Sequence, residues 1–63
     1  MRVTRLVGSC DLNDCPTIYT TDRGTILVQG AVTDEHGLTI PDGESVVEIP
    51  MDLLRKVVRE QLI

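Results

Sequence analysis

Two runs of strand-forming residues lie close together in the first half of the chain. Residues 17–21 read TIYTT and residues 25–32 read TILVQGAV, and a three-residue segment that ends in Gly24 separates them. This spacing fits a hairpin with a type I turn followed by glycine in the left-handed conformation. The pattern therefore predicts two antiparallel strands. Gly30 interrupts the second run, which indicates a bulge or a close approach of another stretch of backbone.

Three further elements are expected around this hairpin. Residues 2–7 alternate in a mixed pattern that predicts a short strand, and residues 45–49 (SVVEI) predict a fourth one. Pro50 ends the fourth strand because proline cannot donate a hydrogen bond to the ladder. From Met51 onward the apolar period becomes helical. The elements together predict an α+β fold, a small, mostly antiparallel four-stranded sheet with one C-terminal helix, in a single domain over residues 1–63.

Two polar segments connect the later elements. Residues 33–37 (TDEHG) are expected to form a turn, with one helical turn capped at Thr33 as an alternative. Residues 40–44 (IPDGE) are expected to form a turn with proline at its second position and glycine at its fourth.

The C-terminal segment carries a broad apolar stripe. Its members are Leu53, Leu54, Val57, Val58 and Leu62, with Gln61 in the same row. Such spacing places them on one face of a helix, opposite a charged face. A helix packed on its own sheet is the simplest interpretation, and the stripe is broad enough to meet a second protein as well. We therefore predict these five apolar residues as a partner-binding or dimer interface.

The apolar residues of the chain are almost all aliphatic. Among 63 residues there are eight Val, seven Leu and five Ile, but one Tyr and no Phe or Trp. Aromatic side chains bury the most surface per residue, and a chain of this size hides only about 60% of the surface that it exposes when unfolded. The composition therefore predicts self-association, as a homodimer or larger.

The charge and the apolar runs exclude several classes of protein. The net charge is −4, and the six basic residues are scattered among ten acidic ones, which argues against direct nucleic-acid binding. No run has the length of a signal peptide or of a membrane span. We therefore expect a cytoplasmic protein without a membrane partner.

Residues 8–16 (GSCDLNDCP) are the segment most suggestive of chemistry. Zinc would need Cys10, Cys15 and the distant His36, with Asp11 or Asp14 as a fourth ligand. The C-x-x-C redox motif is absent, and disulfides are unusual in the cytosol. We favour two thiols that anchor a loop to the sheet, with a disulfide or a zinc site as alternatives. No metal and no cofactor are expected.

No segment has a recognised catalytic pattern. His36 lies in a polar turn without placeable partners, and the chain lacks a phosphate-binding glycine loop and a nucleophile elbow. We therefore predict that the protein is not an enzyme and has no small-molecule substrate.

One segment, about two thirds of the chain, resembles a known family. It runs from residues 15–24 (CPTIYTTDRG) through residues 48–50 (EIP) to the pair Leu53-Leu54. In the order of its elements this segment resembles the small actinobacterial BldB-like proteins, which are often encoded beside helix-turn-helix regulators of the WhiJ type. The resemblance implies dimerisation and partnership with a helix-turn-helix transcriptional regulator, without catalysis.

A second resemblance competes with the first. Residues 46–55 (VVEIPMDLLR) are similar to the strand-Ile-Pro-helix segment of AbrB-type swapped-hairpin transcription factors and antitoxins. That resemblance implies a DNA-binding dimer with a basic arm, and no such arm is evident here. The acidic composition favours an interaction module, homodimeric or partnered with a regulator, over the AbrB-like alternative; a zinc-stabilised module is the third.

Overall fold

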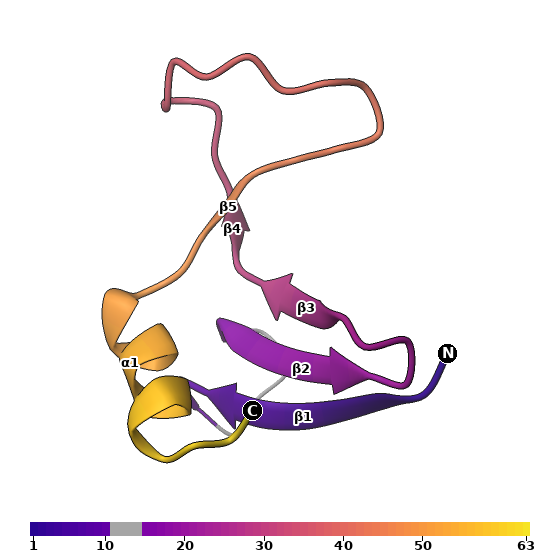
Figure 1. The fold of residues 1–63 in the computed structure, drawn as a ribbon. Coiled ribbons are helices and arrows are strands. Elements are labelled where there is room, and N and C mark those ends of the chain that lie inside the picture. Colours follow the sequence, from indigo (N-terminus) through magenta and orange to yellow (C-terminus); the bar gives the residue numbers. More distant parts are fainter. Residues whose placement is uncertain (11–14) are drawn as a thin grey trace.

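Six secondary-structure elements make up the fold in the computed structural model, which describes residues 1–10 and 15–63 (Figure 1). They are β1 (Val3–Gly8), β2 (Thr17–Thr21), β3 (Ile26–Gln29), β4 (Ala31–Val32), β5 (Val47–Glu48) and α1 (Met51–Arg59). The predicted α+β class, the antiparallel pairing and the C-terminal helix are confirmed.

The strands form two sheets. β2 lies between β1 and β3 in an antiparallel three-stranded sheet, with Ile18 opposite both Val7 and Val28. β4 and β5 pair with each other in a separate two-stranded sheet. The predicted single four-stranded sheet is therefore not found among the described residues. The 25–32 run is divided, and its second part belongs to a different sheet.

Gly30 lies at the point where the run divides. A Cβ at this position would lie 2.5 Å from the carbonyl oxygen of Glu48 and 2.8 Å from a methyl carbon of Ile49. The predicted close approach of backbone at Gly30 is thus confirmed, because any larger residue would collide with the end of β5. The chain turns here from the three-stranded sheet into the smaller one.

The hairpin between β2 and β3 closes as predicted. The Thr21 N–H donates to the Thr25 carbonyl at 3.1 Å, and the two threonine hydroxyls are 2.6 Å apart. Gly24 has φ of +73°, in the left-handed region where an L-residue is strained.

The segment between β4 and β5 contains turns. Residues 33–37 form no helix; the Thr33 hydroxyl accepts a hydrogen bond from the Glu35 N–H at 3.3 Å. The second turn is displaced by one residue from the prediction, since the Glu44 N–H donates to the Pro41 carbonyl at 3.1 Å. The displacement places Gly43, with φ of +87°, at the third position of the turn, where a positive φ is required in type II.

The core is small and lies where α1 packs on β1. Its buried apolar residues are Val7, Ile18, Leu53 and Val57. A bulge between Arg5 and Val7 breaks the alternation of β1, and Leu6 packs against the same core. A bulge adds one residue to a strand and changes the direction in which the neighbouring side chains point. Two consecutive residues of β1, Leu6 and Val7, therefore both contribute to the core.

The C-terminal end of α1 returns the chain to the core. Gln61 has φ of +53°, and its N–H donates to the Val58 carbonyl at 3.2 Å. The Leu62 N–H donates to the Val57 carbonyl at 3.0 Å. These two bonds define a Schellman motif, in which the residue after the left-handed position contacts the last helical turn. The motif explains why Leu62, beyond the helix, still packs on the core.

Replacing Gln61 by glycine should stabilise the fold. Glycine adopts the left-handed conformation without the steric cost that glutamine has there. Part of this stabilisation is offset, because glycine gives the unfolded chain more conformational entropy. We expect the free energy of unfolding, from urea titration, to rise by about 0.5–1 kcal/mol. Glu60→Gly is the control: Glu60 has φ of −94°, so that variant should be destabilised. Destabilisation of both variants would contradict the Schellman geometry.

Candidate functional site

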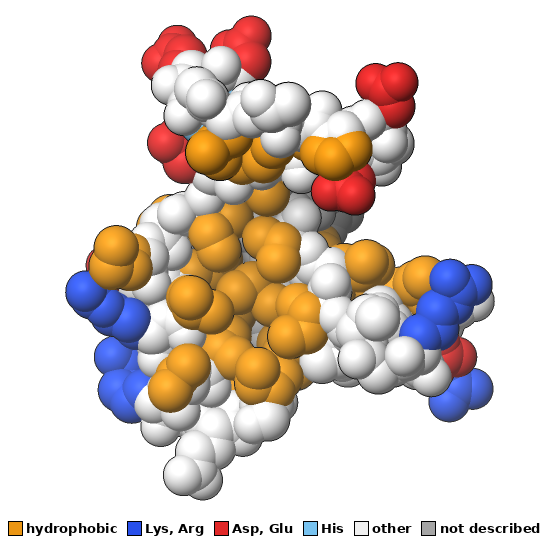
Figure 2. Space-filling model, turned by 45° about the horizontal axis from the view of Figure 1, so that its top comes forward, with side chains coloured by type: hydrophobic (Ala, Val, Ile, Leu, Met, Phe, Trp, Pro, Cys, Tyr) orange, Lys and Arg blue, Asp and Glu red, His pale blue; other side chains and the backbone are white. Residues whose placement is uncertain are grey.

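Most of the large apolar side chains lie outside the core. In the part of the chain that the structure describes, eleven are exposed, whereas the buried core has four apolar residues. The exposed ones are Met1, Val3, Ile26, Leu27, Val28, Val32, Leu38, Met51, Leu54, Val58 and Ile63. Single exposed apolar residues are ordinary, but contiguous apolar areas mark interaction sites. Figure 2 shows one continuous apolar area across the middle of the molecule.

β3 contributes to this surface because the helix does not cover it. α1 packs against β1, at the opposite edge of the three-stranded sheet. Val28 is opposite the buried Ile18, so both side chains lie on the face of the sheet that α1 covers at β1. Ile26, two residues before Val28, lies on the same face. The side chains of Ile26 and Val28 are nevertheless exposed. The sheet therefore has an uncovered apolar end beside the helix.

The predicted helical stripe is divided between the core and the surface. Leu53 and Val57 are 6% and 1% exposed and belong to the core, and Leu62 packs against it. Leu54 and Val58, the next residues along the helix, are 53% and 67% exposed. Of the five residues predicted as an interface, Leu54 and Val58 are thus the two whose side chains are most accessible to a partner.

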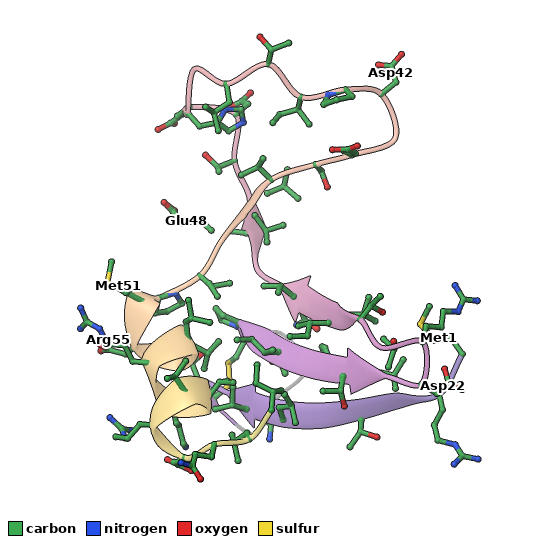
Figure 3. The ribbon with its side chains drawn as sticks, in the orientation of Figure 1. Met1, Asp22, Asp42, Glu48, Met51 and Arg55 are labelled. Carbon is green, nitrogen blue, oxygen red and sulfur yellow. A yellow bond between two sulfur atoms is a disulfide. The ribbon has the colours of Figure 1, made fainter. Side chains whose placement is uncertain are left out.

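Residues 31–48, which we call the arm, project away from the rest of the fold (Figure 1). The arm consists of β4, β5 and the segment between them, and it carries five acidic residues and no Lys or Arg. The acidic residues are Asp34, Glu35, Asp42, Glu44 and Glu48. Figure 3 shows Asp42 near the far end of the arm and Glu48 near its base. The arm is therefore an acidic projection joined to an apolar body.

The helix carries the opposite charge. Arg55, Lys56 and Arg59 are exposed on α1, and Figure 3 shows Arg55 pointing away from the sheet. Arg55 pairs with Asp52 at 3.6 Å and Arg59 with Glu60 at 3.8 Å. These exposed pairs contribute little to stability. Figure 2 shows the acidic groups of the arm and the basic groups of the body on different sides of the apolar area.

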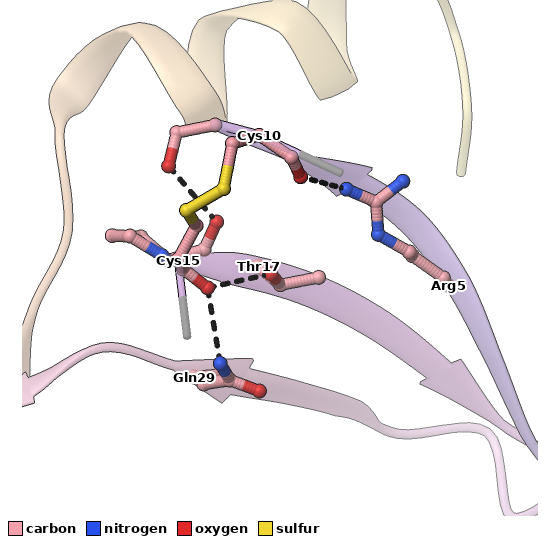
Figure 4. The surroundings of a disulfide bond; sticks show 7 residues. Arg5, Cys10, Cys15, Thr17 and Gln29 are labelled. Carbon is pink, nitrogen blue, oxygen red and sulfur yellow. Dashed lines mark hydrogen bonds between the residues drawn. A yellow bond between two sulfur atoms is a disulfide. The ribbon is translucent and has the colours of Figure 1, made fainter. Parts of the chain in front are cut away.

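Cys10 and Cys15 form a disulfide, with 5.9 Å between their Cα atoms (Figure 4). The favoured prediction of two free thiols is therefore wrong, and the disulfide alternative is correct. The register of β1 and β2 is the reason: Gly8 is opposite Thr17, and the N–H of Ser9 donates to the Pro16 carbonyl at 3.0 Å. One step further along this register, the two cysteines face each other.

Hydrogen bonds hold both ends of the disulfide. The Arg5 guanidinium donates to the Cys10 carbonyl. The Cys15 carbonyl accepts from the Thr17 hydroxyl at 2.8 Å and from the Gln29 side-chain amide at 3.0 Å (Figure 4). The bridge thus connects to all three strands of the larger sheet. Disulfides are typical of oxidising compartments, so the cysteines do not support the cytoplasmic location.

His36 does not join the cysteines. It lines a hollow of about 380 Å³ on the arm, together with Glu35 and Glu48, and its Nδ1 accepts the Leu38 N–H at 2.9 Å. No group of three or more metal-ligating side chains is found in residues 1–10 and 15–63. Asp11 and Asp14, the other predicted zinc ligands, lie outside the described residues. The zinc-stabilised alternative therefore gains no support from the position of His36.

Within the described residues, no helix has the length and apolar character to cross a membrane. Comparisons with models of protein families, with curated proteins and with solved structures found no match to this chain.

Proposed function

We propose that the protein is a non-catalytic interaction module that assembles through its apolar surface, as a homodimer or larger and as the partner of another protein. The observation that carries the proposal is the excess of exposed over buried large apolar side chains. Among the described residues, a monomer buries four apolar side chains and leaves eleven large ones exposed to water, which is unfavourable. Association removes that surface from water.

The size of the chain supports the same conclusion. Domains below roughly 70–80 residues rarely gain more than about 3–5 kcal/mol from a single core, and they commonly add disulfides or partner subunits. This chain has 63 residues and one disulfide. A partner subunit would supply what the core lacks.

The class of partner beyond a second copy follows from the resemblance to BldB-like proteins. That resemblance points to a helix-turn-helix transcriptional regulator. The net charge of −4 supports contact with the regulator in preference to contact with DNA, because phosphates are bound chiefly through clustered Lys and Arg. The module would then affect transcription through the regulator's own DNA contacts.

The proposal predicts a concentration-dependent mass. In sedimentation equilibrium across the micromolar range, we expect a dimer or a larger species that dissociates on dilution. Leu54→Ala and Val58→Ala should weaken this assembly, because both side chains are exposed on the helix. The mass of one chain at every concentration would contradict the proposal.

A DNA-binding dimer, as the AbrB-like resemblance implies, is the second candidate. The observation that favours it is the row of exposed basic residues on α1, Arg55, Lys56 and Arg59. Fluorescence anisotropy with a labelled duplex at increasing salt distinguishes the two. Tight binding that falls steeply with salt and is lost in Arg55→Ala with Arg59→Ala would favour the DNA-binding candidate.

A further inference from the structure

We propose that two copies of the chain exchange their arms: the acidic arm of each copy lies over the apolar surface of the other, with its carboxylates against the basic residues of the other copy's α1. This inference rests on the proposed self-association and specifies its interface. The occupant of the apolar surface is residues 31–48 of a second copy.

The first support is that the arm buries little within its own chain. β4 and β5 pair over two residues each, and one further bond joins the Thr33 N–H to the Val46 carbonyl at 3.3 Å. Two of the five large apolar residues of the arm, Val32 and Leu38, are 77% and 63% exposed, and the other three are only partly buried. An isolated two-stranded hairpin is marginally stable in water. The arm thus carries apolar side chains, Val32 and Leu38 above all, that its own chain leaves exposed.

The second support is charge complementarity. The arm has five carboxylates and no Lys or Arg, whereas Arg55, Lys56 and Arg59 lie together on the last two turns of α1. Both ion pairs found among the described residues lie within the helix and its C-terminal cap, and none joins the helix to the arm. The two charged groups are therefore available to each other between copies. Complementary charges set orientation and partner choice in an interface.

The third support is closure. A two-fold axis makes the two contacts identical, since each copy contributes one arm and one apolar surface. In such a closed dimer the apolar surface of each copy is covered by the other copy's arm, and neither arm is left without a contact. The same arrangement places Leu54 and Val58 beneath the other copy's arm, which accounts for their exposure in the single chain.

Charge reversal on each side tests the exchange. One variant carries Asp42→Lys and Glu44→Lys on the arm, and the other carries Lys56→Glu and Arg59→Glu on the helix. All four side chains are exposed, so both variants should fold, as circular dichroism will show. Each variant alone places like charges in both contacts, and we expect its dimer dissociation constant to rise about tenfold or more.

An equimolar mixture of the two variants should recover the dimer. In the mixed dimer both contacts again join opposite charges, so native mass spectrometry should show the heterodimer in excess over either homodimer. Asp22→Lys, an exposed change of the same sign at the hairpin turn, is the control and should leave the dimer unchanged. A wild-type dimer that both variants keep, without preference for the heterodimer, would overturn the exchange while the proposed self-association stands. A monomeric wild type would overturn both.

Cross-linking gives a second measurement. Lys56 is the only lysine of the chain, so a zero-length carbodiimide joins its amine to carboxylates in direct contact. In a mixture of isotopically light and heavy chains, we expect mixed light–heavy peptides that join Lys56 to the segment containing Asp42 and Glu44. Cross-links from Lys56 to the arm only within one chain would contradict the exchange.

Discussion

Leu53→Ala is expected to unfold a large part of the protein, whereas Leu54→Ala is expected to leave the fold intact. The two leucines are neighbours on α1, so the change in helix propensity is the same. They differ in burial, with 6% of Leu53 and 53% of Leu54 exposed. Replacing a buried leucine by alanine costs about 2–5 kcal/mol, through lost transfer energy and the cavity left behind. A domain this small has little more stability than that to lose.

Urea unfolding at low protein concentration, followed by circular dichroism, measures the first effect. We expect the midpoint for Leu53→Ala to fall far below that of the wild type and the midpoint for Leu54→Ala to shift slightly. Sedimentation measures the effect on assembly, since Leu54→Ala should weaken the association of chains that remain folded. Equal loss of stability in the two variants would mean that α1 packs with a different face toward the sheet.

Loss of the Cys10–Cys15 disulfide is expected to have the second-largest effect. A bridge that closes a short loop stabilises a protein by restricting its unfolded chain, by about 2 kcal/mol for a loop of this length. Here the carbonyls at both ends also accept hydrogen bonds, from Arg5 of β1 at Cys10 and from Gln29 of β3 at Cys15. We therefore expect Cys10→Ser with Cys15→Ser to fold, and to melt at a clearly lower temperature than the oxidised wild type.

Reductant provides the matched comparison. Thermal melting of the wild type with a reducing agent should approach that of the double serine variant, and the same agent should leave the double variant unchanged. If reductant has no effect on the wild type, the two cysteines are not joined in solution. If the double variant is unfolded, the bridge is required for folding as well as for stability.

Local features of this chain could be predicted from the sequence, because their causes are local. The left-handed Gly24 closes a hairpin that residues 17–29 specify within a few positions. Pro50 lies between β5, which ends at Glu48, and α1, and it accepts the first helical hydrogen bond from Leu53 at 3.1 Å. The α+β class follows from these two features.

Features that depend on register or packing could not be predicted in this way. The disulfide exists because Gly8 is opposite Thr17, and the sequence alone does not specify which residues of two strands are opposite. The broad stripe of α1 likewise gave no means to tell Leu53 from Leu54, because both lie within the apolar arc. Which side of the arc is buried depends on where β1 lies. In the sequence the exposed surface was visible only as an excess of aliphatic residues, and the arm only as two polar segments.

The close approach of the backbone at Gly30 and Glu48 affects which changes of sequence the fold can accept. Because β4 and β5 bring the two ends of the arm together, the distance from β3 to α1 does not depend on what lies between Val32 and Val47. The entropy of closing such a loop grows slowly, by about 0.6 kcal/mol for each doubling of its length. Insertions, deletions and new sequences in residues 33–46 are therefore compatible with an unchanged core. The arm can diverge among related chains while the sheet and helix stay the same, and a change of partner then requires no new fold.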